Sequence, residues 1–341
     1  MTELLNNILV CPKCRGPLSE IKDARYCPSC NLTFPLYVGV PDFRGVNPDF
    51  RPSRQEMKIR DALISSYDIA SFKQLIEIRY SLSKRCTSNL CEQQKAFELS
   101  YEQKGTQRLF QINKLLEDCG RTFSRKEVFL DIGCGSGTTV PWIMKGFKKG
   151  IAVDYSLVDL IIGSKFLEEN RISNLKLVCA DARHLPLRAE LFDFVNATDV
   201  IEHILPGQEL FVEEVKRVLK KGGGFYFNSP NRYNLFTPEP HVKVRLVGFM
   251  PRAWMNRYVQ IMKRVNYTTV RLLSLIDLQC LVRNNFSKDF VLTGPFVDLS
   301  ARGTDFKRKV IKQIPFLLTF INCFFRFFTT NYHVIAFKNP D

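Results

Sequence analysis

Residues Val128–Gly137 read Val-Phe-Leu-Asp-Ile-Gly-Cys-Gly-Ser-Gly, and this stretch decides the fold. Apolar residues run into Asp131, after which glycine recurs at every second position. The pattern predicts a buried parallel strand that breaks sharply into a helix. Glycines carry no Cβ atom, so the backbone can pass close to a ligand. The spacing is not Gly-x-Gly-x-x-Gly and no Gly-Lys-Ser/Thr follows, which argues against dinucleotide and nucleoside-triphosphate loops.

Strand-like and helix-like segments alternate after this turn, as a doubly wound α/β sheet requires. The predicted second strand, 150–154, ends on Asp154, and the third, 175–182, contains Asp181 near its end. The fourth and fifth strands are expected at 191–197 and 225–228. Two more strands, at 290–294 and 333–338, would complete the sheet.

The order and content of these segments resemble the class I S-adenosylmethionine-dependent methyltransferases, in the branch that acts on small molecules. The resemblance implies a Rossmann-like seven-stranded sheet with helices on both faces. It also implies S-adenosylmethionine as the cofactor, with Asp154 accepting the ribose hydroxyls and Asp181 near the adenine amine. A helix N-cap is the alternative role for Asp154. The expected cofactor-binding residues are Asp131, Gly133, Cys134, Gly135, Gly137, Asp154, Tyr155, Asp181, Ala182 and Asp199.

Two Cys-x-x-Cys pairs lie near the start of the chain, at Cys11/Cys14 and Cys27/Cys30. Pairs at this separation can direct four thiolates at one tetrahedral zinc ion, which would be structural because no position stays open for water. The region resembles the zinc-ribbon domain related to Trm112. A redox role is the alternative, but no flanking strand–helix unit supports it. We expect the ribbon to have a core of its own.

The chain is therefore expected to comprise a zinc ribbon at 1–45, a helical segment at 46–120 and the methyltransferase domain at 121–341. The helical segment either caps the cofactor pocket or simply connects the two domains. Long insertions at about 229–289 and 295–331 interrupt the last part of the sheet, and long connections on a compact sheet are often functional. We expect these insertions to build the acceptor pocket.

His203 and His241 are the candidate catalytic residues, because an acceptor hydroxyl must lose its proton during methyl transfer. His203 follows the fourth strand, at the edge where ligands enter open α/β sheets. Asp199 and Glu202 are candidates to orient it, to bind a divalent cation or to cap the next helix. His241 follows Pro-Glu-Pro in the first insertion. The tract Asn196–Asp199 lacks the Pro-Pro-aromatic tetrad of exocyclic-amine methylation, so O-methylation of a small or lipid-linked acceptor is favoured.

The formal net charge is +15, and residues 241–341 contain 16 Lys or Arg against 5 Asp or Glu. Such an excess suggests an anionic partner, although a solvated basic face explains it as well. Residues 307–328 begin with a basic cluster and continue as an aromatic, apolar segment, which is typical of a membrane-surface helix or a core helix. No signal peptide or spanning segment is evident, so we expect a cytoplasmic protein, peripheral at the inner face of a membrane.

Two other functions stay open at this point. The ribbon and the basic charge also resemble a ribosomal-RNA guanine methyltransferase, so a ribosomal- or transfer-RNA base is the alternative acceptor, with RNA the less favoured partner. A non-catalytic scaffold with a methyltransferase-like fold is the second alternative. The retained Asp131, Asp154 and Asp181 argue against a scaffold. The sequence predicts neither the acceptor nor the oligomeric state.

Overall fold

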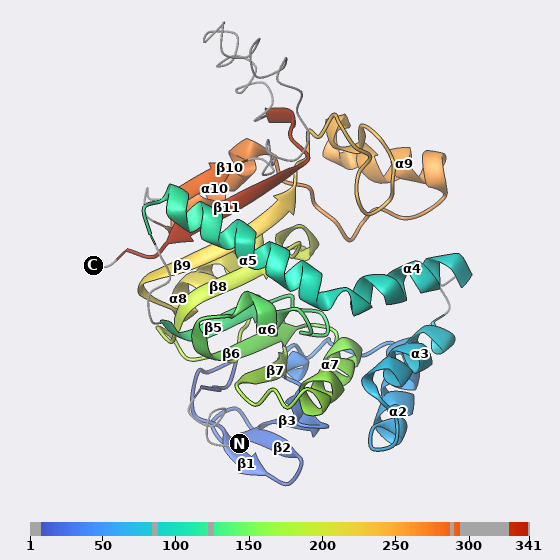
Figure 1. Ribbon diagram of the computed structural model, residues 1–341, viewed down its shortest axis with the longest axis vertical. Coiled ribbons are helices and arrows are strands. Elements are labelled where there is room, and N and C mark those ends of the chain that lie inside the picture. Colours follow the sequence, from blue (N-terminus) through green and yellow to red (C-terminus); the bar gives the residue numbers. More distant parts are fainter. Residues whose placement is uncertain (1–7, 84–87, 122–125, 287–289, 294–326, 340–341) are drawn as a thin grey trace, which may run out of the picture. The chain divides into compact units, whose positions relative to one another are not determined.

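The computed structural model describes residues 8–83, 88–121, 126–286, 290–293 and 327–339 (Figure 1). The chain divides into two compact units. The first unit comprises Met1–Ala197, Glu213–Phe225 and Lys338–Asp341, and the second comprises Thr198–Val212 and Tyr226–Phe337. The boundary between them passes through strand β9 and helix α8, so neither unit is one continuous stretch of chain.

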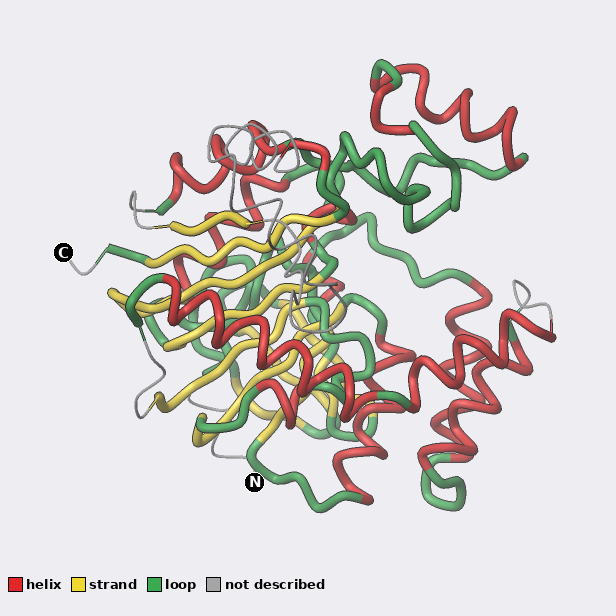
Figure 2. The backbone as a smooth tube through the Cα atoms, turned by 45° about the horizontal axis from the view of Figure 1, so that its top comes forward, coloured by secondary structure: helices red, strands yellow, loops and turns green. Residues whose placement is uncertain are grey.

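A seven-stranded sheet has the order β10-β11-β9-β8-β5-β6-β7 (strands yellow in Figure 2). The strands are β5 (Lys126–Ile132), β6 (Phe147–Asp154), β7 (Leu175–Cys179), β8 (Phe192–Thr198), β9 (Leu219–Pro230), β10 (Phe290–Thr293) and β11 (Asn331–Phe337). Strand β5 pairs in parallel with both β6 and β8, and β6 pairs in parallel with β7. Strand β10 runs antiparallel to β11. The predicted α/β class, the seven strands and their approximate positions are confirmed.

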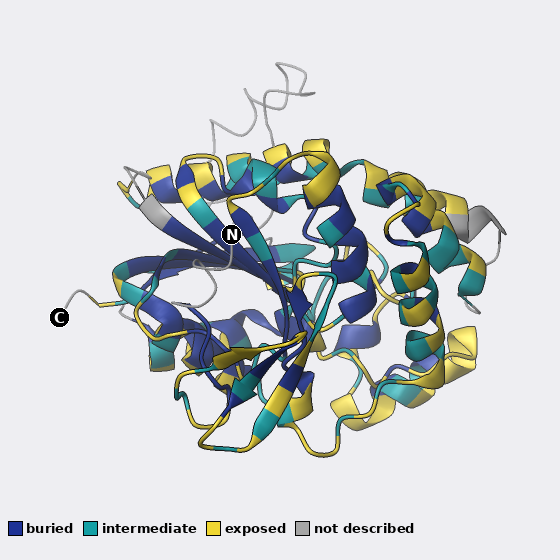
Figure 3. Ribbon diagram, turned by 90° about the horizontal axis from the view of Figure 1, so that it is seen from below, coloured by how far each residue is buried: buried dark blue, intermediate teal, exposed yellow. Residues whose placement is uncertain are grey.

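Strand order reverses at β5, because the chain goes from β5 outward to β6 and β7 and then returns to β8 on the other side. In open α/β sheets a ligand crevice forms at such a point, outside the carboxyl ends of the strands. The strands that flank it are buried: Phe129, Ile151 and Val195 are each at most 1% exposed (dark blue in Figure 3). Their apolar runs are what both faces of a covered parallel sheet require.

Helices surround this sheet or precede it in the chain. They are α2 (Arg54–Ser66), α3 (Phe72–Leu82), α4 (Ser88–Leu99), α5 (Tyr101–Asp118), α6 (Val140–Ile143), α7 (Leu157–Glu169), α8 (Gln208–Val218), α9 (Arg252–Lys263) and α10 (Leu275–Asn285), with short 3-10 turns η1 (Arg44–Val46), η2 (Ile201–His203) and η3 (Val247–Phe249). Helices α2 to α5 lie within the predicted helical segment 46–120. Helix α3 begins after the Ser71 N-cap, whose side chain and Gln74 form a capping box.

Four short antiparallel strands form the ribbon: β1 (Ser19–Ile21), β2 (Ala24–Cys27), β3 (Leu32–Tyr37) and β4 (Val40–Pro41). The ribbon does not stand apart from the sheet, contrary to our expectation. Phe43 N donates to Cys179 O at the end of β7 (2.8 Å), and Val10 N donates to Pro186 O (3.0 Å). Because the ribbon takes up backbone groups next to the edge strand, it is part of the first unit.

The second unit contains the predicted first insertion, which forms η3, α9 and α10. Helix α9 places Met255 and Val259 in a small apolar core with Val244, Val247 and Tyr267. Most of the second insertion, including residues 307–326 of the predicted interfacial segment, lies outside the described residues. Among the helices that are described, none combines the length and the apolar character needed to span a bilayer.

Candidate functional site: a glycine turn, a carboxylate and a pair of histidines

The glycine turn after β5 depends on backbone conformations that other residues avoid. Gly133, Gly135 and Gly137 have φ angles of +72°, +58° and +70°. A side chain in this left-handed region is strained, so the three positions need glycine. The backbone of the turn also lies close to helix α7, since a Cβ atom at Gly163 would lie 1.8 Å from Ser136 O. Helix α7 therefore packs closely against the turn, and the glycines of the turn leave its backbone without side chains.

Asp154 lies at the carboxyl end of β6 and closes this turn. Its Oδ2 accepts a hydrogen bond from Gly135 N (2.7 Å), and its Oδ1 accepts one from Ser156 N (2.8 Å). A carboxylate can accept several hydrogen bonds through its two oxygens, which suits the two adjacent hydroxyls of a ribose. Burial, together with the nearby Asp159, raises the pKa of Asp154 to about 6, against the opposing effect of the backbone N–H groups of Ser156, Gly135 and Tyr155. These residues fit an adenosine-containing cofactor, because acceptor oxygens and a Cβ-free backbone occur together.

Asp131, which precedes the turn, is 3% exposed and accepts a hydrogen bond from the Asn196 side chain. Burial raises the pKa of Asp131 to about 7. Cys134 follows in the turn, where burial raises the pKa of its thiol well above the usual value. A buried carboxylate beside the glycine turn suits a ligand group that carries positive charge, because an anionic group there would be repelled.

The third predicted acid is already paired. Arg183 donates from Nε to Asp181 Oδ1 (2.9 Å) and from a terminal nitrogen to Oδ2 (2.6 Å). Burial acts to raise the pKa of Asp181, but the Arg183 hydrogen bonds outweigh it and the pKa lies below its usual value. Asp181 is thus an ionised, oriented carboxylate next to Ala182. Its contact with an adenine amine stays a prediction.

Tyr155, the residue after Asp154, is 51% exposed and anchors a link to the ribbon. Arg44 donates to the Tyr155 carbonyl oxygen (3.0 Å) and lies over the Tyr155 ring. The guanidinium also pairs with Asp42 (2.8 Å) and Glu56 (2.6 Å), and Arg44 is only 3% exposed. This buried network joins the end of the ribbon and helix α2 to the strand end that carries Asp154.

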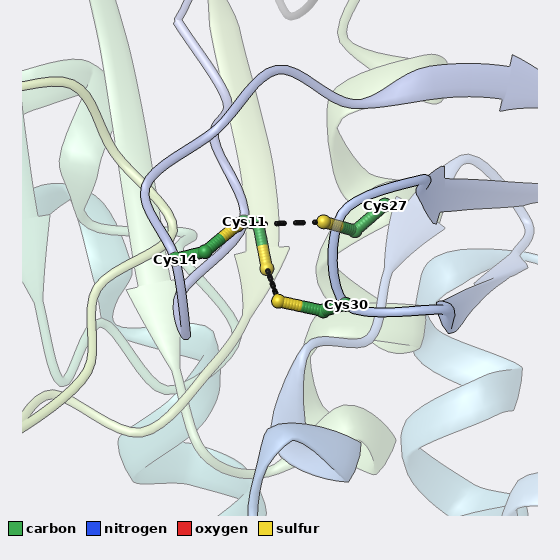
Figure 4. Close-up of side chains that lie close together, drawn as sticks. All are labelled: Cys11, Cys14, Cys27 and Cys30. Atoms are coloured by element: carbon green, nitrogen blue, oxygen red, sulfur yellow. Dashed lines mark hydrogen bonds between the residues drawn. The ribbon is translucent and has the colours of Figure 1, made fainter.

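The four ribbon cysteines come together as the sequence predicted (Figure 4). Cys14 Sγ lies 3.5 Å from Cys27 Sγ, and Cys11 Sγ lies 3.9 Å from Cys30 Sγ. Four sulfurs at about 2.3 Å from a tetrahedral zinc are about 3.8 Å apart, so the cluster fits that ion. The N–H of Gly16 is the largest of the influences that lower the pKa of Cys14 to about 7, toward the thiolate that a metal requires.

In the second unit, the residues after β8 and those of the first insertion form another polar cluster. His241 Nε2 faces His203 Nε2 at 3.2 Å, and the two rings meet edge to face. His241 Nδ1 donates to Glu239 Oε1 at 2.5 Å, while Glu239 Oε2 accepts from the backbone N–H groups of His241 and Val242. The two histidines that sequence analysis selected are therefore neighbours, oriented by a glutamate that it did not select.

Both histidines line a cavity of about 410 Å³ whose other walls come from residues 242–270. Burial and the neighbouring His241 lower the pKa of His203, which keeps its ring neutral near pH 7. Glu202, beneath the pair, is 0% exposed, and burial raises its pKa to about 8. Asp199 belongs to the same unit, where its carboxylate and backbone exchange hydrogen bonds with the Asn228 side chain (2.7 and 2.8 Å). The sequence did not predict this contact, and the role of Asp199 in cofactor binding stays a prediction.

Comparison with known protein families identifies the domain that contains the glycine turn and Asp154. Residues 130–227, which contain the glycine turn, Asp154 and Asp181, match the methyltransferase domain family. Residues 2–36 match the Trm112p-like protein family. The chain carries a methyltransferase domain. The match ends at residue 227, so the cavity walls formed by the first insertion lie beyond it.

Two relatives of this methyltransferase domain are O-methyltransferases. The chain is 33% identical over 138 residues to the malonyl-[acyl-carrier protein] O-methyltransferase of Marinomonas sp., covering 40% of this chain and 48% of that protein. It is 28% identical over 105 residues to the ubiquinone biosynthesis O-methyltransferase of Coxiella burnetii, covering 30% and 43%. The chain therefore spans about half the length of the curated relatives it matches.

Among solved structures, an S-adenosylmethionine-dependent methyltransferase from Clostridium acetobutylicum is similar at a TM-score of 0.46 and 14% identity, covering 73% of this chain and 99% of the other. The assignment of the methyltransferase domain rests on the family match and the strand order, not on this likeness.

Sequence reasoning missed the residues that orient the site rather than form its motifs. Glu239 carried a signal, since it lies two residues before His241 between two prolines. The contacts of Arg44 with Tyr155 and of Asn228 with Asp199 carried none, because these partners are far away in sequence.

Proposed function

We propose that this protein transfers the methyl group of S-adenosylmethionine to a hydroxyl oxygen of a small or lipid-linked acceptor. The cofactor half of the proposal is supported by the glycine turn and by the oriented Asp154 carboxylate at the end of β6. The choice of oxygen is supported by one observation, the oriented pair of imidazoles at the cavity. Both named relatives act on oxygen, which agrees with this choice.

When bound, the sulfonium of S-adenosylmethionine supplies an activated methyl group for in-line displacement. The protein then has to hold the cofactor, exclude water and remove one proton from the acceptor. We assign the first task to Asp154, through the ribose, and to the bare backbone of the glycine turn. Loss of the acceptor proton is assigned to the centre formed by His203 and His241.

The Glu239 carboxylate determines which ring nitrogen of His241 carries the hydrogen. Because Glu239 accepts from Nδ1 of His241, that nitrogen carries a hydrogen and the neutral ring presents the lone pair of Nε2 toward His203. A fixed tautomer of this kind is how a carboxylate prepares an imidazole for proton transfer or for ligation. Positioned groups of this type contribute about 10²–10⁴-fold to a rate.

We further propose that the ribbon binds one structural zinc ion through Cys11, Cys14, Cys27 and Cys30. Support comes from the sulfur separations and from the absence of a water position in a four-thiolate set. Through Arg44, the ribbon is joined to the strand end that carries Asp154. Zinc would thereby stabilise the cofactor site as well as the ribbon.

A lipid-linked acceptor is supported by an exposed surface on and after helix α9. Its apolar members, Trp254, Ile261, Met262 and Val265, are 67%, 72%, 56% and 45% exposed. Residues 240–276 contain seven basic residues, Lys243, Arg245, Arg252, Arg257, Lys263, Arg264 and Arg271, and no Asp or Glu. Exposed apolar side chains flanked by basic ones are typical of helices that lie on an anionic membrane surface. We call Trp254, Arg257, Ile261, Met262, Lys263 and Val265 the α9 surface.

The test is methyl transfer from isotopically labelled S-adenosylmethionine into a lipid extract, a panel of soluble phenols and structured RNA, with the product located by mass spectrometry. The proposal expects label in an ether-linked methyl group of a lipid or a phenol. Label on a nitrogen or carbon, or label in RNA alone, would replace it. No transfer to any of the three, in protein that binds the cofactor, would favour a binding function.

A further inference from the structure

The geometry points to a divalent-metal site formed by Glu202, His203 and His241, separate from the ribbon cysteines. The ligand atoms of these three residues lie within 4.8 Å of one another in the second unit. Binding of the ion does not require the proposed methyl transfer. Only its consequence for the acceptor rests on that function.

The spacing of the two histidines is the first argument. Two nitrogens bound to one tetrahedral zinc at about 2.0–2.1 Å lie about 3.3 Å apart, and the two Nε2 atoms lie 3.2 Å apart. In the metal-free protein this separation is a hydrogen bond from His203 Nε2 to His241 Nε2, whose hydrogen a bound ion would replace. His241 has its hydrogen on Nδ1, so its Nε2 atom offers a lone pair at the ligand position.

The carboxylate of Glu202 is the second, independent argument. Glu202 is 0% exposed, and neither of its side-chain oxygens has a hydrogen-bond partner. Buried polar groups are generally hydrogen-bonded, and buried charges are paired or coordinate metals, so this carboxyl group lacks the partner that an ion would supply. Its backbone is fixed by 3-10 turn η2 and by the hydrogen bond from Arg271 N to Glu202 O (2.8 Å). A side-chain movement on the order of 1 Å brings an oxygen to bonding distance of an ion held by the histidines.

Glu239 supplies the third argument, because it contacts a ligand rather than the ion. Histidines that bind metals usually donate their other ring N–H to a carboxylate, which fixes the ring and raises its basicity. Glu239 is 5% exposed and accepts from His241 Nδ1. Glu239, buried beside a solvent-facing histidine, is placed to orient His241 as a metal ligand.

Three protein ligands leave one tetrahedral position open, and the cavity of about 410 Å³ lies beside the histidines. A hydroxyl that occupies this position would have its pKa lowered by the ion. In the proposed reaction, the hydroxyl would lose its proton to solvent water, and the two histidines would act as ligands rather than as bases. The site has the two-histidine, one-carboxylate composition of catalytic zinc sites.

Cobalt titration of the full-length, metal-depleted protein tests the site without an activity measurement. Cobalt bound by thiolates has strong sulfur-to-metal charge-transfer absorption, whereas cobalt bound by histidine and carboxylate does not. We expect two equivalents of cobalt per chain, of which only one produces thiolate absorption. The double variant His203→Ala/His241→Ala should bind one equivalent, with the thiolate absorption unchanged.

The matched control is His184→Ala, an exposed histidine outside both clusters, which should still bind two equivalents. Glu239→Gln leaves every ligand in place and should weaken the second equivalent about 10–100-fold. Thermal unfolding of each variant shows whether it is folded.

A single equivalent in the wild-type protein would overturn the inference, and so would a second equivalent that survives in the double variant. Methyl transfer that persists at full rate in protein with only the ribbon metal would leave the proposed function standing and remove the ion from it.

Discussion

The first unit takes its polar groups from short motifs at the ends of neighbouring strands, whereas the second takes its polar groups from segments that are far apart in the chain. Gly135 and Asp154 are held by backbone hydrogen bonds at the turn and at the strand end. His203 and His241 are 38 residues apart and meet only because the first insertion folds back. A cofactor shared by many enzymes is bound by a local, recurring arrangement, while an acceptor is bound by what each chain adds.

A change in the ribbon should give the largest effect, because the proposed zinc ion would support only the first unit directly. Cys27→Ser should remove zinc, lower the melting temperature and weaken cofactor binding, since Arg44 joins the ribbon to the end of β6. Structural zinc sites contribute on the order of 10 kcal/mol in small domains, so the loss should be large. Metal analysis and thermal unfolding measure it.

Cys280→Ser is the matched control, because this exposed thiol belongs to no cluster of the described residues. It should leave zinc content and melting temperature unchanged. Equal stability of both variants would mean that the ribbon does not support the sheet.

Removal of the histidines should separate the two units by function. His203→Ala and His241→Ala are each expected to lower kcat about 10²–10⁴-fold with unchanged affinity for S-adenosylmethionine. His184→Ala, which changes an exposed histidine elsewhere, should have neither effect. Steady-state kinetics measures kcat, and a cofactor titration on the same samples measures the affinity for S-adenosylmethionine. A parallel loss of cofactor affinity would show that the division by function is wrong.

Acid pH should act on the first unit through Asp154, whose pKa burial raises to about 6 from the ordinary 3.8. A protonated carboxyl loses acceptor capacity, so cofactor affinity should fall by up to about tenfold per pH unit below 6. Asp154→Asn should bind weakly and lose the part of the pH dependence centred near 6, while the part due to Asp131, whose pKa is about 7, remains. Affinity measured by calorimetry from pH 5 to 8 checks this.

The same raised pKa has the opposite effect on the stability of the cofactor-free protein. Between pH 3.8 and about 6 the folded protein binds more protons at Asp154 than the unfolded chain does. The contribution of this group to stability is therefore full below pH 3.8 and is lost as the pH rises through 6. If cofactor affinity and the Asp154 contribution to stability changed in the same direction with pH, the assignment of the raised pKa to Asp154 would be contradicted.

The α9 surface should affect only binding to membranes. Arg257→Glu/Lys263→Glu removes two basic residues and should weaken binding to anionic liposomes by about 2 kcal/mol, or about 30-fold. Lys22→Glu/Lys73→Glu makes the same change in net charge at exposed positions of the first unit and should not weaken liposome binding. Co-sedimentation at low salt compares them. If both double variants lose binding equally, total charge is responsible and the α9 surface is not.

The cofactor motifs were predictable because each is a local pattern with one physical cause. Positive φ angles require glycine at 133, 135 and 137, and an acid at the end of β6 is readable from the apolar run before it. The four cysteines were predictable for the same reason. The coupling of the ribbon to β7 was not, because it depends on backbone hydrogen bonds between segments about 140 residues apart, such as Phe43 N to Cys179 O.

The histidine cluster shows more clearly what could not be predicted from the sequence. His203 and His241 were selected one by one, as unusual residues near a strand end and in a proline-bounded loop. Their contact, the buried Glu202 and the orientation by Glu239 depend on how the first insertion folds, which no periodicity in residues 229–289 expresses.

The most direct test of the account is a calorimetric titration of S-adenosylmethionine into three proteins: the wild type, Asp154→Ala and His203→Ala/His241→Ala. We expect the wild type and the histidine variant to bind with equal affinity. Asp154→Ala should bind about 5–150-fold more weakly, as the loss of about 1–3 kcal/mol of hydrogen bonding to a charged group implies. Equal binding by wild type and Asp154→Ala, or a comparable loss in the histidine variant, would contradict the assignment of the cofactor to the first unit.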